Sequence, residues 1–376
     1  MPMTRKSFLA ALIALTPLAM AHADTPRALP FRAAVQGCGD VDVARVQPLL
    51  DGLFTQTPET RGVLLLVNGC PAYKAYEQGY SDANRMISWS MAKTVTAMLV
   101  GALVADGKLD PNAPAPIAEW HRPGDPRARI TLADLLHMAS GLRHIEVGDP
   151  IEKSDTNQVL FVTGTQDMAA RAIAQPLVHP PGTHFEYSSL TTIILSEIIT
   201  RTLTDSHDPR VRAQAYRQFA QSRLFGPVGV KSAFLEFDGA GTQIGGSLIY
   251  MTLDDWGRMG TLLLKGQSRD GKQVVAPRWL AFMKRPSEAY AGYGGQTWLN
   301  HQPKGQEPGL FTSKGPRNAV GMKGHLGQFV MAGSGTAPDG TARSIVLVRL
   351  GHTDEGKMQP ILSRMGDVFD ALLKAD

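Results

Sequence analysis

The sequence predicts an α+β fold in which one sheet is assembled from both ends of the chain, with a helical lobe inserted between its halves. Three observations predict it. Apolar strand patterns occur early in the chain and return late, a long block of capped helices separates them, and amphipathic helices stand near both ends of the folded part. We therefore expect a cleft between the sheet and the lobe.

The composition is that of an ordinary globular protein, with 43% hydrophobic, 19% charged and 7% aromatic residues among 376. The formal net charge of +4 falls to about +2 once Arg5 and Lys6 are set aside. The remaining basic residues are scattered rather than gathered on one face, so we do not expect a nucleic-acid partner.

The first 23 residues have the pattern of a secretory signal peptide. Arg5 and Lys6 precede an apolar run over 8–20, and Ala21-His22-Ala23 follows as a small-x-small cleavage site. The run is shorter than the roughly 18 to 20 residues of a membrane helix, and no later segment supplies such a stretch. An uncleaved membrane anchor is the alternative. We expect cleavage after Ala23, a periplasmic or secreted protein, and no membrane attachment afterwards.

The part after residue 23 is longer than the roughly 250 to 300 residues at which single hydrophobic cores stop growing. Two subdomains are therefore expected within one domain over 24–376. Segments 24–89 and 240–376 are predicted to form the sheet subdomain, and 90–239 a mainly helical one.

The early elements are a helix, a hairpin and a second helix. Apolar residues at helical spacing predict an amphipathic helix over 42–56. Strand-forming residues over 63–67 and 72–76 flank Asn68-Gly69, the strongest short turn signal, and predict a hairpin. The helical pattern over 91–106 then ends before a glycine.

The middle of the chain is helical, and strands return late. Thr131 and Asp134 form a capping box for a helix that Gly141 closes. Further helices are predicted over 165–174, 189–202, 211–224, 252–264 and 361–374. Strands are predicted over 247–251, 297–300, 327–332 and 344–350, and the glycine-rich stretch over 239–246 is interpreted as a loop. Trp298 is interpreted as a buried strand residue, and a position lining the cleft is the alternative.

Cys38 and Cys70 are the two cysteines, and both lie in the part expected to be exported. An oxidising compartment permits a disulfide, so we hypothesise that they pair; two buried free thiols are the alternative. No Cys-x-x-Cys or His-Glu-x-x-His occurs. We therefore expect neither a metal ion nor an organic cofactor.

Ser90-Met91-Ala92-Lys93 is the central chemical signal. A serine and a lysine three residues apart in the first turn of a helix lie on one face, so the amine can sit beside the hydroxyl. An amine kept partly neutral by burial can accept the serine proton, and the helix N-terminus favours a developing oxyanion. The pattern alone is weak, because an N-cap serine with a solvated lysine produces it too.

The residues around this pair resemble the active-site signature of the penicillin-recognising serine hydrolases. That family also has a Tyr-x-Asn motif in its helical lobe and a Lys-Thr-Gly-like motif on a late strand. Here Tyr187-Ser188-Ser189 and His325-Leu326-Gly327-Gln328 follow in the same order. The chain is most similar to the class C β-lactamase-like branch that includes 6-aminohexanoate-dimer hydrolases and carboxylesterases. This resemblance covers nearly the whole chain after the signal and implies a β-lactamase/transpeptidase-like fold with an antiparallel sheet.

The resemblance implies a role for each motif. Ser90 would be the acylated nucleophile and Lys93 its proton acceptor. Tyr187 would relay the proton to the leaving group, with its pKa lowered by a cation such as Lys93. The backbone N–H groups of Ser90 and Gln328 would form the oxyanion hole, with Gly327 allowing close approach of the substrate.

Two positions depart from the β-lactamase pattern. Ser189 replaces the asparagine of Tyr-x-Asn, and His325 replaces the strand lysine that would hold a substrate carboxylate. A purely structural role is the alternative for His325. Both departures weaken the case for β-lactam hydrolysis and favour the amidase and esterase branch.

The sequence thus predicts an exported serine hydrolase that cleaves an amide or ester bond of a small molecule through an acyl-Ser90 intermediate. A β-lactamase or D-alanyl-D-alanine peptidase is the enzymatic alternative. A non-catalytic module that binds cell-wall fragments is the second. Oligomeric state stays open.

Overall fold

The computed structural model describes residues 31–32, 43–57, 59–268, 270–302, 305, 308–311 and 313–374. The predicted signal peptide and Cys38 lie outside this part. Cys70 is disulfide-bonded. Within the described part, no helix combines the length and the apolar character needed to cross a bilayer.

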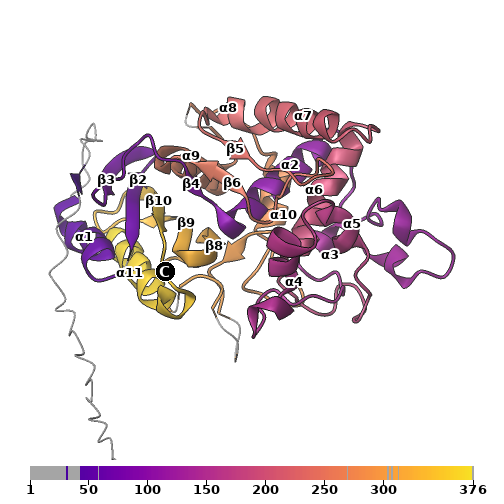
Figure 1. Ribbon diagram of the computed structural model, residues 1–376. Coiled ribbons are helices and arrows are strands. Elements are labelled where there is room, and N and C mark those ends of the chain that lie inside the picture. Colours follow the sequence, from indigo (N-terminus) through magenta and orange to yellow (C-terminus); the bar gives the residue numbers. More distant parts are fainter. Residues whose placement is uncertain are drawn as a thin grey trace, which may run out of the picture.

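The main sheet has seven strands in the order β1-β3-β2-β10-β9-β8-β7, and every neighbouring pair is antiparallel. The β2–β3 hairpin turns at Asn68 (φ 52°) and Gly69 (φ 82°), the left-handed pair that an Asn-Gly turn supplies. The pairing of β2 with β10 joins the two ends of the chain, as Figure 1 shows. The strands are β1 (Phe31–Arg32), β2 (Thr60–Val67), β3 (Cys70–Tyr76), β7 (Trp298–Leu299), β8 (Val320–Gly324), β9 (Gln328–Thr336) and β10 (Ala342–Gly351).

Helices cover both faces of this sheet. Alternate residues of a strand face opposite sides, so Val63 and Leu65 enter the core beneath the terminal helices while Leu64 and Leu66 enter the larger core beneath α9. The covering helices are α1 (Gln47–Thr55) and α11 (Met358–Leu372) on one face, and α9 (Leu253–Lys265) on the other.

The helical lobe lies beside the sheet, with α2 and α6 packed together at its centre (Figure 1). The capping box of Thr131 and Asp134 is present, but the helix that it starts ends at Leu136, because Met138 adopts φ 55° well before Gly141. The lobe contains α2 (Ala92–Ala105), α3 (Leu132–Leu136), α4 (Asp155–Asn157), α5 (Met168–Ile173), α6 (Ser189–Leu203), α7 (Pro209–Ala220) and α8 (Gly226–Val228); α10 (Pro277–Met283) follows later.

The strands differ from the prediction in two places. The predicted strand over 247–251 does not join the main sheet: β6 (Ile249–Met251) pairs with β4 (Met86–Ile87) and β5 (Phe234–Leu235) in a separate three-stranded sheet. β8 was not predicted, because its sequence Val-Gly-Met-Lys-Gly is poor in strand-forming residues. Pairing on both sides, with β7 and β9, holds it in the sheet.

We expect Gly101→Ala to destabilise the protein, although alanine is the better helix former. A Cβ at position 101 of α2 would lie 2.1 Å from the Trp279 ring, whose indole N–H donates to the Ala97 carbonyl at 2.9 Å. Overpacking of this kind costs about 1 to 3 kcal/mol in the free energy of unfolding. Urea unfolding followed by circular dichroism measures it.

Gly52→Ala in α1 is the matched control. Its Cβ would meet the guanidinium end of Arg364, which can move away. This variant should be within about 1 kcal/mol of wild type or more stable. Equal stability of the two variants would contradict close packing of Trp279 on α2.

Candidate active site

The start of α2 brings Ser90 and Lys93 together. A 3₁₀ turn over Trp89–Met91 leads directly into the helix, so the two side chains are one turn apart on the same face. Lys93 is 1% exposed, and its Nζ donates to Ser90 Oγ at 2.9 Å. It also donates to Ser189 Oγ at 2.8 Å and to the Gly246 carbonyl at 2.9 Å, which engages all three donors of an ammonium group.

Burial determines the charge state of this lysine. Removal from water lowers the pKa of Lys93 to about 8, and the negative charge of Glu146 acts in the opposite direction. The neutral amine is therefore accessible near neutral pH. A neutral amine at hydrogen-bond distance from a serine hydroxyl can accept its proton.

Glu146 is a member of the site that the sequence reasoning missed. Its carboxylate accepts hydrogen bonds from Ser189 N at 2.8 Å and Ser189 Oγ at 2.6 Å, at the N-terminus of α6. His144 Nε2 lies 2.6 Å from Glu146 Oε2, and Thr156 Oγ1 donates to that oxygen at 2.8 Å. No motif marks Glu146, because it lies 43 residues from Ser189 in the sequence.

The surroundings of Glu146 keep it ionised. Burial by itself would raise its pKa, but the His144 hydrogen bond and the charge of Lys93 outweigh burial and hold the pKa at about 2. Lys93, Ser189 and Glu146 therefore form a continuous hydrogen-bonded chain behind Ser90. One end of this chain is the Ser90 hydroxyl and the other is a fixed negative charge.

Tyr187 lies beside the pair, but its pKa differs from the expectation. Lys93 Nζ is 4.9 Å from the centre of the Tyr187 ring. Burial, with a further contribution from Glu146, raises the pKa of Tyr187 well above its ordinary value, and hydrogen bonding to Ser90 and Trp298 only partly opposes the rise. The expected lowering by Lys93 is therefore wrong for this state, and Tyr187 carries its proton at neutral pH.

The late-strand motif, expected at His325-Leu326-Gly327-Gln328, reaches the site with earlier residues than expected. Lys323, Gly324 and His325, at the end of β8, line the cavity above Ser90. Gly327 and Gln328 do not line it. The Gln328 side chain instead is buried against the last strand, where its Nε2 donates to the Gly351 carbonyl at 2.6 Å.

The glycine-rich segment before β6 supports the site rather than serving only as a loop. The Gly246 carbonyl accepts from Lys93 and the Gly245 carbonyl accepts from Thr96 Oγ1 at 3.0 Å. A Cβ at Gly246 would lie 2.8 Å from the Ser189 carbonyl, so a larger residue would push this loop away from the start of α6. Close approach explains glycine at this position.

A cavity of about 370 Å³ opens above Ser90. Ser90, Tyr187, Ser189 and His325 line it. Segment 146–161 supplies much of one wall. Trp298, at the start of β7, lines the cavity too, in agreement with the alternative interpretation of this residue. The apolar lining includes Trp89, Val147, Ile151, Leu160, Phe161 and Trp298.

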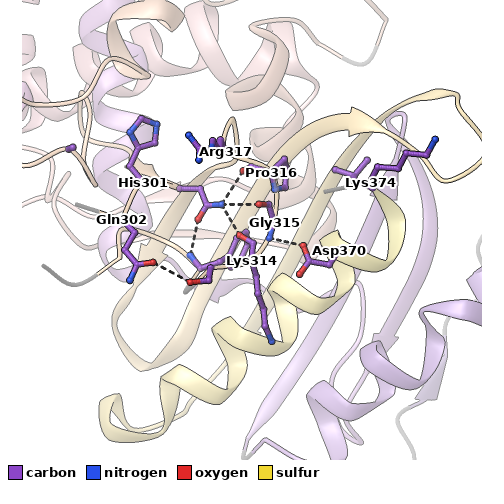
Figure 2. A pocket seen from close by; sticks show the side chains of 13 residues that line it. His301, Gln302, Lys314, Gly315, Pro316, Arg317, Asp370 and Lys374 are labelled. Atoms are coloured by element: carbon purple, nitrogen blue, oxygen red, sulfur yellow. Dashed lines mark hydrogen bonds between the residues drawn. The ribbon is translucent and has the colours of Figure 1, made fainter. Parts of the chain in front are cut away.

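A larger cavity, of about 650 Å³, lies elsewhere, between the loop after β7 and α11. Figure 2 shows the side chains that line it, among them His301, Lys314, Arg317 and Asp370. It contains no serine–lysine pair like that of Ser90 and Lys93, so the smaller cavity is the candidate active site. Among the residues that the structure describes, no group of three His, Cys, Asp or Glu side chains is arranged to hold a metal ion.

Solved structures with the same fold include hydrolases of several kinds. A Bacillus anthracis protein assigned as a 6-aminohexanoate-dimer hydrolase is 20% identical, with 92% of this chain and 87% of that chain covered and a TM-score of 0.64. A family VIII carboxylesterase is 15% identical, with 90% and 99% covered and a TM-score of 0.62. A D-stereospecific amidohydrolase from Streptomyces is 16% identical, with 89% and 99% covered and a TM-score of 0.56.

These structures share the fold with this chain, which confirms the β-lactamase/transpeptidase-like architecture. A search of curated protein sequences gives no match. The profile of the family described as Beta-lactamase, in contrast, matches residues 50–359, which include the helix of Ser90 and Lys93, Tyr187 and the end of β8. The chain therefore belongs to the beta-lactamase family of serine hydrolases.

Proposed function

We propose that the protein is an exported serine hydrolase that cleaves a carboxylic ester or amide through an acyl-Ser90 intermediate. The observation that carries the proposal is the buried Lys93 amine, 2.9 Å from Ser90 Oγ, with its pKa lowered to about 8. A lysine with only a structural role would not need a hydrogen bond to a serine that lines a cavity.

Acylation uses Lys93 as the base. The neutral amine takes the proton of Ser90, and Oγ attacks the substrate carbonyl carbon to form a tetrahedral oxyanion. We assign the stabilisation of that oxyanion to the backbone N–H of Ser90 and to an N–H at the end of β8, because both segments line the same cavity. This assignment moves the second donor from Gln328 to the neighbourhood of Gly324 and His325.

Tyr187 completes each half-reaction as a proton carrier. Because it is protonated at rest, it can give its proton to the leaving alcohol or amine when the tetrahedral intermediate collapses. The resulting phenolate lies beside the Lys93 ammonium, which stabilises it. It then accepts a proton from the water that attacks the acyl-enzyme. As the second tetrahedral intermediate collapses, Lys93 returns its proton to Ser90 Oγ and the carboxylic acid product leaves.

A second candidate function, β-lactamase or D-alanyl-D-alanine peptidase, is favoured by Lys323. This residue supplies a strand cation two positions before His325, with Nζ 4.2 Å from the Trp298 ring centre in the cavity wall. It could hold a substrate carboxylate, which the replacement of the motif lysine by His325 had argued against. The predominantly apolar cavity wall favours the esterase or amidase.

Export rests on the N-terminal pattern, with cleavage after Ala23, and on the compartment that a disulfide requires. On this proposal the mature enzyme works in the periplasm or outside the cell, without membrane attachment and without a cofactor.

We expect a fluorophosphonate to add once to the wild-type protein and not to Ser90→Ala, because only an activated serine reacts. Intact-mass spectrometry of protein from the periplasmic or secreted fraction measures the adduct and also reports whether residues 1–23 have been removed. The variant should keep its circular dichroism spectrum and lose turnover by at least about 10³-fold.

A substrate panel then separates the candidate functions. Short p-nitrophenyl esters and aminohexanoate oligomers distinguish esterase from amidase, and rapid hydrolysis of a chromogenic cephalosporin would instead favour the β-lactamase candidate. Absence of any adduct in folded protein would overturn the proposal and leave a module that only binds cell-wall fragments.

Activity should rise with pH through the pKa of Lys93. The lysine is the base in its neutral form, so the rate of acylation is low when pH is below about 8 and levels off above it. The pH dependence of kcat/KM for p-nitrophenyl acetate, corrected for spontaneous hydrolysis, measures this. A rate that is flat between pH 6 and pH 9 would rule out Lys93 as the titrating base.

Glu146→Gln should shift that rising limb to lower pH. The carboxylate raises the pKa of Lys93, so removing its charge leaves the lysine neutral at lower pH. Glu146→Asp, which keeps the charge, is the control and should leave the limb near its wild-type position. A uniform loss of rate in both variants, without displacement of the limb, would assign Glu146 a structural role only.

A further inference from the structure

Exposed apolar side chains are concentrated at the mouth of the candidate active site. Among the described residues, eight large hydrophobic side chains are exposed, and five of them belong to one segment, 145–162. We call these five the apolar rim: Ile145 (38% exposed), Val147 (69%), Ile151 (53%), Phe161 (56%) and Val162 (56%). Single exposed hydrophobic residues need no explanation, but a cluster beside a cavity indicates a binding surface.

The apolar rim is continuous with the cavity that contains the nucleophile. Val147, Ile151 and Phe161 are exposed to solvent and also line the cavity above Ser90. The Phe161 ring makes an edge-on contact with Trp89, with 6.4 Å between ring centres, and Trp89 directly precedes Ser90. An unbroken apolar path therefore leads from the serine to the protein surface.

Hydrogen bonds hold this segment in place. Ser154 Oγ donates to the Glu146 carbonyl at 2.6 Å, and the Ile145 N–H donates to the Asp155 carboxylate at 2.9 Å. The Glu146 side chain is fixed at the start of α6, as described above. A surface that is already ordered loses little entropy when it binds a ligand.

The position of the proton donor indicates which part of the substrate meets the rim. Tyr187 protonates the leaving group, and its ring contacts Trp298 at 5.4 Å rather than a residue of the rim. The leaving group therefore belongs beside Tyr187 and Trp298. The acyl chain then lies on the other side of the cavity, along Trp89 and Phe161.

We propose that the apolar rim binds the acyl chain of the substrate, so that the enzyme prefers esters of medium-chain fatty acids to those of short-chain acids. This inference rests on the proposed function, because it requires Ser90 to be acylated. Each methylene that becomes buried can raise kcat/KM by up to about fourfold, provided that the chain is in contact in the transition state.

A chain-length series tests the proposal. We expect kcat/KM for p-nitrophenyl octanoate and decanoate, below their critical micelle concentrations, to exceed that for the acetate at least about tenfold. Phe161→Ser should lower the octanoate value about tenfold more than it lowers the acetate value, because the acetate has no chain to lie on the rim. Phe161→Leu should restore most of the octanoate rate, since it returns an apolar side chain.

Phe234→Ser is the matched control. Phe234 is 51% exposed, but it lies on β5 and does not line the cavity. It should leave the preference for long chains unchanged. Equal loss in both serine variants, or wild-type rates that do not rise from acetate to octanoate, would overturn the assignment of the rim.

Failure of the inference can be told apart from failure of the proposed function. Turnover of the acetate without any gain for longer chains would overturn the rim alone. Calorimetric binding of decanoate and butyrate to Ser90→Ala needs no turnover, and decanoate should bind at least about tenfold more tightly. Equal affinities would count against the rim even if no ester were hydrolysed.

Discussion

The burial of one amine is the constraint on which the site depends. Lys93 has lost almost all contact with water, which would be prohibitive for an ammonium without partners. Three acceptors surround it, from the 3₁₀ turn before α2, from the start of α6 and from the loop before β6. The same burial brings its pKa to about 8, so the arrangement that makes the charge tolerable also makes the neutral base accessible.

This constraint determines how closely the surrounding elements pack. A Cβ at Gly245 would lie 2.1 Å from Ser196 Oγ of α6, and one at Gly324 would lie 2.2 Å from the Ser88 carbonyl. Glycine at these points lets the loop before β6 reach Lys93 and lets the end of β8 come up against the residues before Ser90. The sheet and the helical lobe thus meet at the nucleophile.

Local features of the sequence predicted much of this arrangement. The β2–β3 hairpin follows from Asn68-Gly69, and the contact between Ser90 and Lys93 follows from helical spacing, because in each case the interacting residues are neighbours in the chain. β8 was missed because its place in the sheet comes from pairing partners and not from its own residues. For the same reason the register of the third motif was placed too late, at Gly327 and Gln328.

The sequence could not predict the role of Glu146 or the raised pKa of Tyr187, for a different reason. Both depend on how far groups distant in the sequence are removed from water and on which charges they face there. Tyr-x-Asn spacing could place Tyr187 in the lobe, but it says nothing of a carboxylate 41 positions earlier, at Glu146, that helps keep the phenol protonated.

One segment joins the two properties of the site that distinguish this chain. Glu146 is fixed to the start of α6, while Val147, its neighbour, belongs to the apolar rim. The carboxylate sets the charge around Lys93 from the inner side of the segment, and the rim offers an apolar surface from the outer side. Because hydrogen bonds to Ser154 and Asp155 hold both sides together, a change in the rim that shifted this backbone would also move Glu146 relative to Lys93. If the rim binds the acyl chain and Lys93 is the base, as proposed, substrate selection and the strength of the base are coupled through the backbone of residues 145–155.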